Sequence, residues 1–250
     1  MFDAIGLSPE GFVIAVLMTF GAAFVRGVTG FGMAIILVPL LGLVIAPEQA
    51  VVAAILLQLL IGPVGLRRVI TDSEKESVLP ISLTAVATTP LGLLALTTIP
   101  ADQARLLIAV IAIGAFVLVT LPTSAAARPP GRIATLLTGS AAGLLAGFAG
   151  MPGPPVVPYY MRRNLPPRSA RASMILVFFA TAIMGSLVAA LRGLATPSLL
   201  ALSAALFLPM LAGNWLGGQL FGRVPARLWR VGVGLVLGIA AASALFRLVA

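Results

Sequence analysis

A long apolar chain that breaks its helical pattern at the same place in both halves is strongly constrained in what it can fold into. Residues 22–32 form a glycine-rich run inside an apolar segment, and residues 142–153 form a similar run in the second half. The matching positions are Gly27 with Gly147 and Gly30 with Gly150 at an offset of 120, Pro39 with Pro158 and Pro47 with Pro166 at 119, and, more weakly, Pro100 and Arg105 with Pro225 and Arg230 at 125. A duplicated unit with a glycine-proline break in each copy is typical of secondary transporters.

Composition indicates that the chain lies in a membrane. Sixty per cent of its residues are hydrophobic and 9% are charged, whereas soluble domains carry about 25% charged residues. It has no cysteine and no histidine, which excludes disulfides, thiolate metal sites and a histidine proton carrier. We therefore expect no catalytic residue, no metal and no cofactor, and the scattered arginines do not favour a nucleic-acid partner. The first ten residues contain Asp3 and Glu10 but no basic residue, so we do not expect a cleavable signal peptide.

Hydropathy divides the chain into eight apolar segments. These are Gly11–Ala46 (interrupted at Arg26–Gly32), Ala50–Leu66, Val78–Leu96, Leu106–Leu121, Ile133–Met161 (broken at Gly147–Pro155), Met174–Leu191, Leu199–Leu220 and Val231–Val249. The linker Pro122–Arg132 separates the halves. A helix that crosses a bilayer needs about 20 residues, so the first segment is too long for one span and its two pieces are short for two. Re-entrant half-helices would resolve this, because irregular backbone is tolerated at membrane depth only when protein or a cavity surrounds it.

The distribution of basic residues tests this arrangement. If the chain formed eight simple helices with an outer N-terminus, the basic residues would divide eight to seven between the two sides. If each broken segment counts as two legs, twelve lie inside and only Arg105, Arg192 and Arg247 lie outside, with Arg26 left in the break. Basic residues collect on the inner side of membrane proteins, so we favour the second arrangement. Five legs in each half make the two halves inverted repeats and place both termini outside.

The two breaks are the predicted binding elements. Glycine permits unusual backbone angles and close approach of a ligand, and the N-terminus of a half-helix presents free N–H groups and a positive dipole. Two such breaks that meet at the midplane would suit an anion. Gly30, Gly32, Gly150 and Gly153 favour this interpretation, whereas the alternative is that the glycines only pack helices together, as Gly143 and Gly147 would do.

Arg26 is the only basic residue inside an apolar segment and far from a loop. Two interpretations stay open: its guanidinium binds the oxygens of an anionic substrate as a bidentate fork, or it reaches to the interface as a topology anchor. Uncharged polar residues in apolar segments more often join helices than bind ligands, but Gln58 and Asn214 are the better site candidates among them. The predicted substrate-binding residues are Arg26, Thr29, Gly30, Phe31, Gly32, Gln58, Gly150, Met151, Gly153, Pro154, Pro155 and Asn214.

The pattern over Gly27–Pro39, its second copy over Gly147–Pro158, the Gly153–Pro155 turn and the following Tyr159 resemble the TauE/SafE family of sulfite and organosulfonate exporters. The resemblance covers nearly the whole chain, as two copies of the family's repeat. It implies an anion transporter of the bacterial inner membrane that handles sulfite, sulfoacetate or related sulfur-containing anions.

We therefore expect an all-α, polytopic membrane protein built from two inverted repeats, residues 1–124 and 125–250. Each repeat would hold one re-entrant element and three or four further transmembrane helices. The expected function is secondary transport of a small sulfur-containing anion by alternating access, in the direction of export. An anion channel and a carrier for small carboxylates are the alternatives, and a membrane-embedded enzyme is disfavoured because no acid-base or metal cluster occurs. The sequence leaves oligomerisation open.

Overall fold

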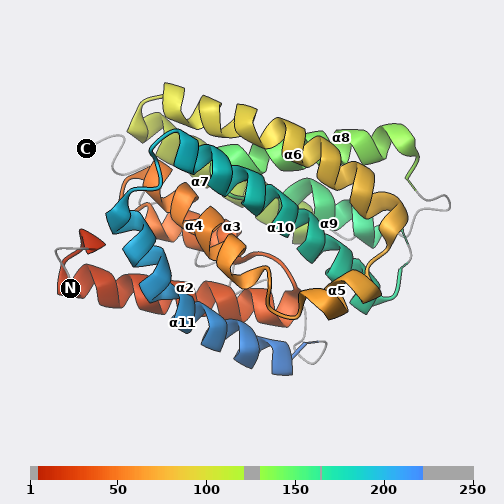
Figure 1. Cartoon of the computed structure of the whole chain (residues 1–250), viewed down its shortest axis with the longest axis horizontal. Helices are drawn as coiled ribbons and strands as arrows, with labels where there is room; N and C mark the ends of the chain where they lie inside the picture. Colours follow the sequence, from red (N-terminus) through yellow and green to blue (C-terminus); the bar gives the residue numbers. More distant parts are fainter. Residues whose placement is uncertain (1–4, 121–129, 164, 222–250) are drawn as a thin grey trace.

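The structure, a computed structural model, describes residues 5–120, 130–163 and 165–221, in which every regular element is a helix (Figure 1). Its helices are α2 (Pro9–Thr29), α3 (Met33–Leu41), α4 (Pro47–Ile61), α5 (Leu66–Asp72), α6 (Lys75–Thr98), α7 (Ala101–Thr120), α8 (Arg132–Ala149), α9 (Gly153–Met161), α10 (Pro167–Leu191) and α11 (Pro197–Gln219). The predicted all-α class is confirmed. The predicted segment 231–249 and the boundary at residues 124 and 125 lie outside the described residues.

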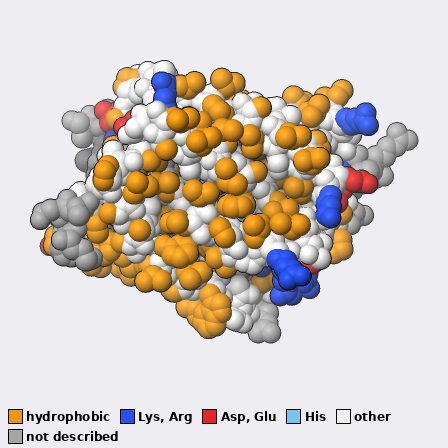
Figure 2. Space-filling view, viewed as in Figure 1, with side chains coloured by type: hydrophobic (Ala, Val, Ile, Leu, Met, Phe, Trp, Pro, Cys, Tyr) orange, Lys and Arg blue, Asp and Glu red, His pale blue; other side chains and the backbone are white. Residues whose placement is uncertain are grey.

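Within the described part of the chain, six helices are long and apolar enough to cross a membrane: α2, α6, α7, α8, α10 and α11. A seventh span is obtained if α4 and α5 count together, although they meet at an angle of 85°. Sequence reasoning expected one continuous span over Ala50–Leu66, and the turn Gly62–Gly65 ends it instead. Gly65 has φ +72°, a left-handed conformation that glycine adopts without strain. Hydrophobic side chains cover most of the face shown in Figure 2. Exposed leucines of the long helices include Leu83 and Leu187.

The two short helices α3 and α9 each contain nine residues, which is about 14 Å and roughly half of a bilayer core. Both lie inside the protein. All of α3 is buried except Leu40, and α9 buries six of its nine residues, including Tyr159 and Tyr160. This agrees with the expected half-helices, since non-helical backbone beside them is then enclosed by protein.

The first break covers residues 30–32 and the second covers residues 150–152. Gly30 and Gly32 have φ values of +90° and +88°, and Gly150 has φ +68°. At this last position the N–H caps α8 by bonding to the carbonyl oxygen of Ala146. Both breaks are narrower than the sequence suggested. Arg26 lies in the last turn of α2, not in the break, and Gly153–Pro155 begin α9, where missing N–H groups cost nothing.

Two helix crossings hold the molecule together, α2 with α11 and α6 with α8, at opposite edges of the view in Figure 1. Glycine makes each crossing close. A Cβ atom on Gly217 would lie 2.1 Å from the carbonyl oxygen of Phe24, and one on Gly92 would lie 2.1 Å from that of Leu144. Such distances leave no room for a side chain, so these backbones touch because both positions are glycine.

The crossings are reciprocal in sequence. Phe24 and Leu144 are 120 residues apart, and Gly217 and Gly92 are 125 apart, the same offsets that relate the two halves. A helix near the start of each half therefore packs on a helix from the later part of the other half. Inverted repeats remain a prediction, which this pairing favours.

Charged side chains collect at one end of the molecule, around α5 (Figure 2). Arg168 pairs with Asp72 at 2.7 Å and Arg163 with Glu74 at 2.5 Å, so the connections before α6 and before α10 lie side by side. A hydrogen bond of 2.8 Å between the hydroxyls of Thr135 and Tyr159 adds the start of α8 to the same end. This is the end that the basic-residue count assigns to the cytoplasm.

Candidate anion-binding site

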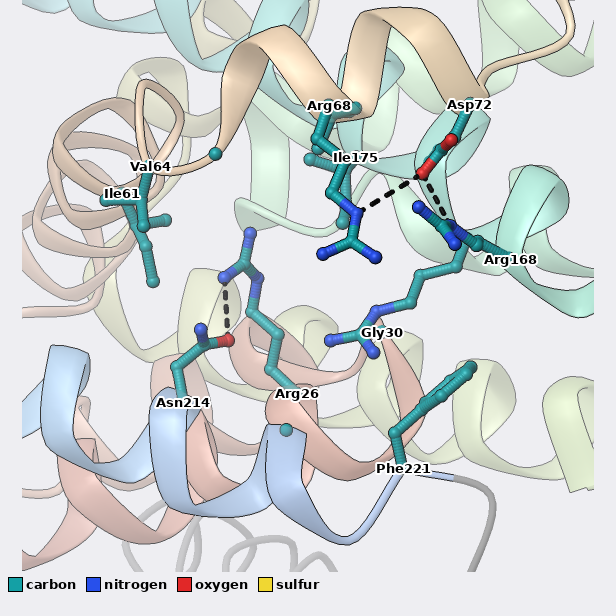
Figure 3. Close-up of a pocket in the computed structure, with 15 residues that line it drawn as sticks. Arg26, Gly30, Ile61, Val64, Arg68, Asp72, Arg168, Ile175, Asn214 and Phe221 are labelled. Carbon is teal, nitrogen blue, oxygen red and sulfur yellow. Dashed lines mark hydrogen bonds and ion pairs between the residues drawn. The ribbon is translucent and has the colours of Figure 1, made fainter.

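Two cavities meet at Arg26. The larger, which we call the basic cavity, has a volume of about 460 Å³ and lies between α2, α5, α10 and α11 at the charged end of the molecule (Figure 3). The smaller, which we call the break cavity, has a volume of about 20 Å³ and lies between the two breaks. A volume of this size holds about one water molecule, so only the basic cavity has room for a small organic anion.

Arg26 points from α2 into the basic cavity and is 9% exposed. One guanidinium nitrogen, Nη1, donates a hydrogen bond of 3.0 Å to the amide oxygen of Asn214 on α11. The close crossing of α2 and α11 brings these two residues together, although 188 positions separate them. The side chain therefore turns toward a cavity between helices rather than toward lipid. Of the two open interpretations of Arg26, this geometry favours the binding site.

Arg171 is a second arginine in the basic cavity, and sequence reasoning missed it. Its Nη2 donates a hydrogen bond of 3.1 Å to the carbonyl oxygen of Gly27, and its guanidinium carbon lies 4.4 Å from the centre of the Phe221 ring. Its aliphatic stem crosses the first break, because a Cβ atom on Gly30 would lie 2.7 Å from its Cγ. Residue type alone gave no signal, since the position follows a loop and was counted only as a cytoplasmic charge.

The outer part of the basic cavity carries an ion-pair cluster of Arg68, Asp72 and Arg168. The carboxylate of Asp72 lies 2.7 Å from Nε of Arg168 and 3.8 Å from Nε of Arg68 (Figure 3). The side chain of Arg168 is 61% exposed and that of Arg68 is 73% exposed, so water screens their charges. Among the described residues, no carboxylate pairs with Arg26 or Arg171. Of the three excess positive charges in the described lining, two therefore lie at the inner end and one lies in the water-exposed outer cluster.

The break cavity brings together six predicted site residues from the two halves of the chain. Its lining includes Arg26, Phe31, Gly32, Gln58, Met151 and Gly153. The amide nitrogen of Gln58 on α4 donates a hydrogen bond of 3.1 Å to the carbonyl oxygen of Gly150. The N-termini of α3 and α9 both begin at this cavity, so their dipoles are directed into it.

Other predicted site residues lie beside the cavities. The Thr29 hydroxyl is 2.8 Å from the carbonyl oxygens of Val25 and Phe31, so it stabilises the turn of the first break. Pro154 is buried and Pro155 is partly buried in the first turn of α9, and neither lines the basic or the break cavity. Their structural contribution is to begin α9. Gly30 and Asn214, by contrast, line the basic cavity together with Arg26.

A positive, partly enclosed cavity of this kind can bind an anion by hydrogen bonds from guanidinium groups. Across the described residues, no group of three or more acidic, histidine or cysteine side chains is arranged to hold a metal ion.

Comparison with known proteins agrees with this architecture. The family model of the sulfite exporter TauE/SafE matches residues 15–244. A probable sulfite/organosulfonate exporter TauE from Cupriavidus necator is 28% identical over 227 residues, which covers 87% of this chain and 88% of that protein. No solved structure matches the chain significantly. The match over nearly the full length, together with the apolar helices, shows that the chain is a multi-pass transport protein of the inner membrane and belongs to the sulfite exporter TauE/SafE family.

Proposed function

We propose that this protein transports small sulfur-containing anions, such as sulfite, sulfoacetate or other organosulfonates, and that the anion binds in the basic cavity against Arg26. The observation that carries the proposal is the burial of Arg26 beside a cavity of about 460 Å³ with an amide, not a carboxylate, as its hydrogen-bond partner. A buried charge without a counter-charge is costly in a membrane protein. An anionic substrate supplies the missing charge.

The geometry of Arg26 suits an oxyanion. A guanidinium group has five N–H donors in a planar fork, and the bond to Asn214 uses one of them. The remaining donors can bind two oxygens of a sulfonate, sulfite or carboxylate at once. The name of the Cupriavidus necator relative, a probable sulfite/organosulfonate exporter, supports a sulfur-containing oxyanion and outward transport.

Alternating access is the mechanism that the fold supports best. The basic cavity reaches the charged end of the molecule, whereas the break cavity closes the path between the two halves with a volume of about 20 Å³. Movement of one half against the other about the reciprocal crossings would open this closed point and close the basic cavity. The glycine contacts in both crossings allow helices to slide with little side-chain interlocking.

Binding by the purified protein tests the substrate and the role of Arg26 together. We expect sulfite, sulfoacetate and isethionate to bind the wild type in calorimetry and to bind Arg26→Ala about tenfold to a hundredfold more weakly. Arg26→Lys should lose less affinity because it keeps the charge but not the fork. Circular dichroism and size-exclusion chromatography of each variant control for folding. Unchanged affinities in both folded variants would remove Arg26 from the site.

A channel is the competing mechanism. In proteoliposomes a carrier gives saturable counterflow, in which unlabelled sulfonate inside drives uptake of labelled sulfonate, whereas a channel gives electrical conductance without saturation. We expect counterflow. Conductance with a linear dependence on anion concentration would reject alternating access while leaving the anion site in place.

The orientation of the basic cavity is proposed from the count of basic residues, which places it on the cytoplasmic side. The chain has no native cysteine, so single cysteines can report accessibility directly. A cysteine at Arg67 or Arg162 should react with a membrane-impermeant maleimide only in inside-out vesicles. Labelling of both in right-side-out vesicles would invert the proposed topology.

A further inference from the structure

We infer that the basic cavity selects anions that carry two negative charges, because Arg26 and Arg171 together form a pair of uncompensated guanidinium groups at its inner end. This inference rests on the proposed function and adds the charge class of the substrate.

The charge balance of the cavity lining is uneven. Four arginines and one carboxylate line it: Arg26, Arg68, Arg168, Arg171 and Asp72. The one carboxylate is used at the outer cluster, 2.7 Å from Arg168. Within the described residues, the two inner arginines bond only to neutral acceptors, the amide oxygen of Asn214 and the carbonyl oxygen of Gly27. The excess charge at the inner end is therefore two, since arginine does not deprotonate in proteins.

The structure holds the two inner arginines next to the same short stretch of α2. One belongs to α2 itself, and Arg171 bonds to the carbonyl oxygen of the next residue, Gly27. The Phe221 ring, 4.4 Å from the Arg171 guanidinium carbon, orients that group without neutralising it. Both guanidinium groups line the same cavity, and each has N–H donors beyond the one that bonds to Asn214 or Gly27, so an anion bound at the inner end would have both groups beside it.

Two like charges that are removed from water repel each other and each loses hydration. A singly charged anion compensates one of them and leaves the other. A dianion compensates both, either as one small oxyanion between the two groups or as two acidic groups on a short chain. A zwitterion brings an ammonium group toward two arginines, and Asp72 is already paired, so we expect zwitterions to bind most weakly.

Calorimetry with four probes of similar size tests this selection: sulfoacetate (two charges), methanesulfonate (one charge), taurine (zwitterion) and malonate (two carboxylates). For the wild type we expect sulfoacetate to bind at least about tenfold more tightly than methanesulfonate, as one additional charge-assisted contact predicts. We expect taurine to bind more weakly than methanesulfonate. Equal affinities for sulfoacetate and methanesulfonate would overturn the inference.

Variants of Arg171 identify the source of the selection. Arg171→Gln should weaken sulfoacetate by about tenfold or more and methanesulfonate by less than about threefold, so the preference collapses. Arg171→Lys keeps the charge and should keep the preference. Arg192→Gln, at the C-terminal cap of the same helix and exposed, is the matched control and should leave every affinity unchanged. A uniform loss for all anions in Arg171→Gln would contradict the inference.

The outcomes separate this inference from the proposed function. If sulfoacetate and methanesulfonate bind equally well, the anion site stands and the charge selection fails. If malonate binds but no sulfonate does, the charge selection stands and the proposed substrate class fails. Should Arg171→Gln not fold, the wild-type series and Arg171→Lys still decide, because a loss of the preference in the lysine variant contradicts selection by charge.

Discussion

The two helix crossings share a backbone geometry and differ in chemistry. Gly217 packs on Phe24 in one crossing, and Gly92 packs on Leu144 in the other. In both, a Cβ atom on the glycine would lie 2.1 Å from the carbonyl oxygen of the facing residue. The arginines do not repeat, and the amide of Asn214 is replaced by a hydroxyl. By the same offsets Arg26 corresponds to Ala146 (120), Asn214 to Thr89 (125) and Arg171 to Val52 (119).

This difference separates what builds the scaffold from what builds the site. Small residues recur in both crossings because close helix packing is needed twice. Arg26 and Arg171 have apolar counterparts, and both line the basic cavity beside α5. Two similar helix crossings therefore carry different polar groups. The four predictions below test this separation, from the largest expected effect to the smallest.

The scaffold glycines should be equally sensitive on both sides. Gly217→Leu and Gly92→Leu each force a side chain into backbone 2.1 Å away, so we expect neither variant to give a folded protein in size-exclusion chromatography. Gly21→Leu on α2, where nothing lies within 4 Å, is the control and should behave as the wild type. If only one crossing proved sensitive, the two would not be structural equivalents.

Substitution of a polar residue should weaken anion binding at the α2–α11 crossing but not at the α6–α8 crossing. Arg26→Ala removes a charge-assisted contact and should weaken sulfonate binding by about tenfold to a hundredfold. Thr89→Ala should leave the affinity unchanged, because the Thr89 hydroxyl is buried and donates to the carbonyl oxygen of Ala85 on its own helix at 2.7 Å. Calorimetry on both variants measures this. A comparable loss in Thr89→Ala would show that the substrate contacts both crossings.

The glycines that cap α2 and α8 should both affect stability, but only the one beside the basic cavity should affect anion binding. Gly30→Ala and Gly150→Ala both place a side chain on a left-handed backbone, at a cost of about 1–2 kcal/mol in stability. Only Gly30→Ala also displaces Arg171, whose Cγ would lie 2.7 Å from the new Cβ. We therefore expect lower thermal stability for both and weaker anion binding for Gly30→Ala alone. Weaker binding in Gly150→Ala would place the anion in the break cavity.

The smallest effect should come from the outer cluster. Asp72→Asn breaks an ion pair with Arg168, whose side chain is 61% exposed, and such pairs contribute about 0–1 kcal/mol. We expect a change in the unfolding midpoint of at most a few degrees and stronger binding of anions at low salt, because one negative charge leaves the cavity lining. Weaker binding would mean that Asp72 orients the arginines for the substrate.

Glycine and proline predicted the breaks because these residues act locally on the backbone. Gly30 and Gly150 end their helices as expected, and the half-helices α3 and α9 follow the breaks. The expectation that the piece before the first break is short for a full span was wrong, because α2 is long enough to cross a membrane, as is α8. The turn at Gly62–Gly65 was missed, although its two glycines and Pro63 are the same kind of signal. The helix that follows it, at residues 66–72, is short and carries two arginines, so it does not stand out as an apolar segment. Segment length was given more weight than turn chemistry there.

The site could be predicted only in part because it depends on contacts between distant residues. Arg26 and Asn214 were each selected as polar residues in apolar segments, but nothing in the sequence pairs α2 with α11. Arg171 was missed for the same reason. Gly30 in the first break and Arg171 near the start of α10 are 141 positions apart in the sequence. They lie in contact only because the fold brings the two segments together.

The narrowness of the break cavity has an electrical consequence. Water-filled space conducts ions, so a membrane potential falls mainly across the part of a protein that excludes water. Here that part begins where Phe31 and Met151 close a space of about 20 Å³. An anion bound at Arg26, as we propose, would lie next to this closed point, because Arg26 lines both cavities. If that anion carries two charges, crossing the closed point toward the positive side of the membrane would be favourable by up to about 4.6 kcal/mol for each 100 mV.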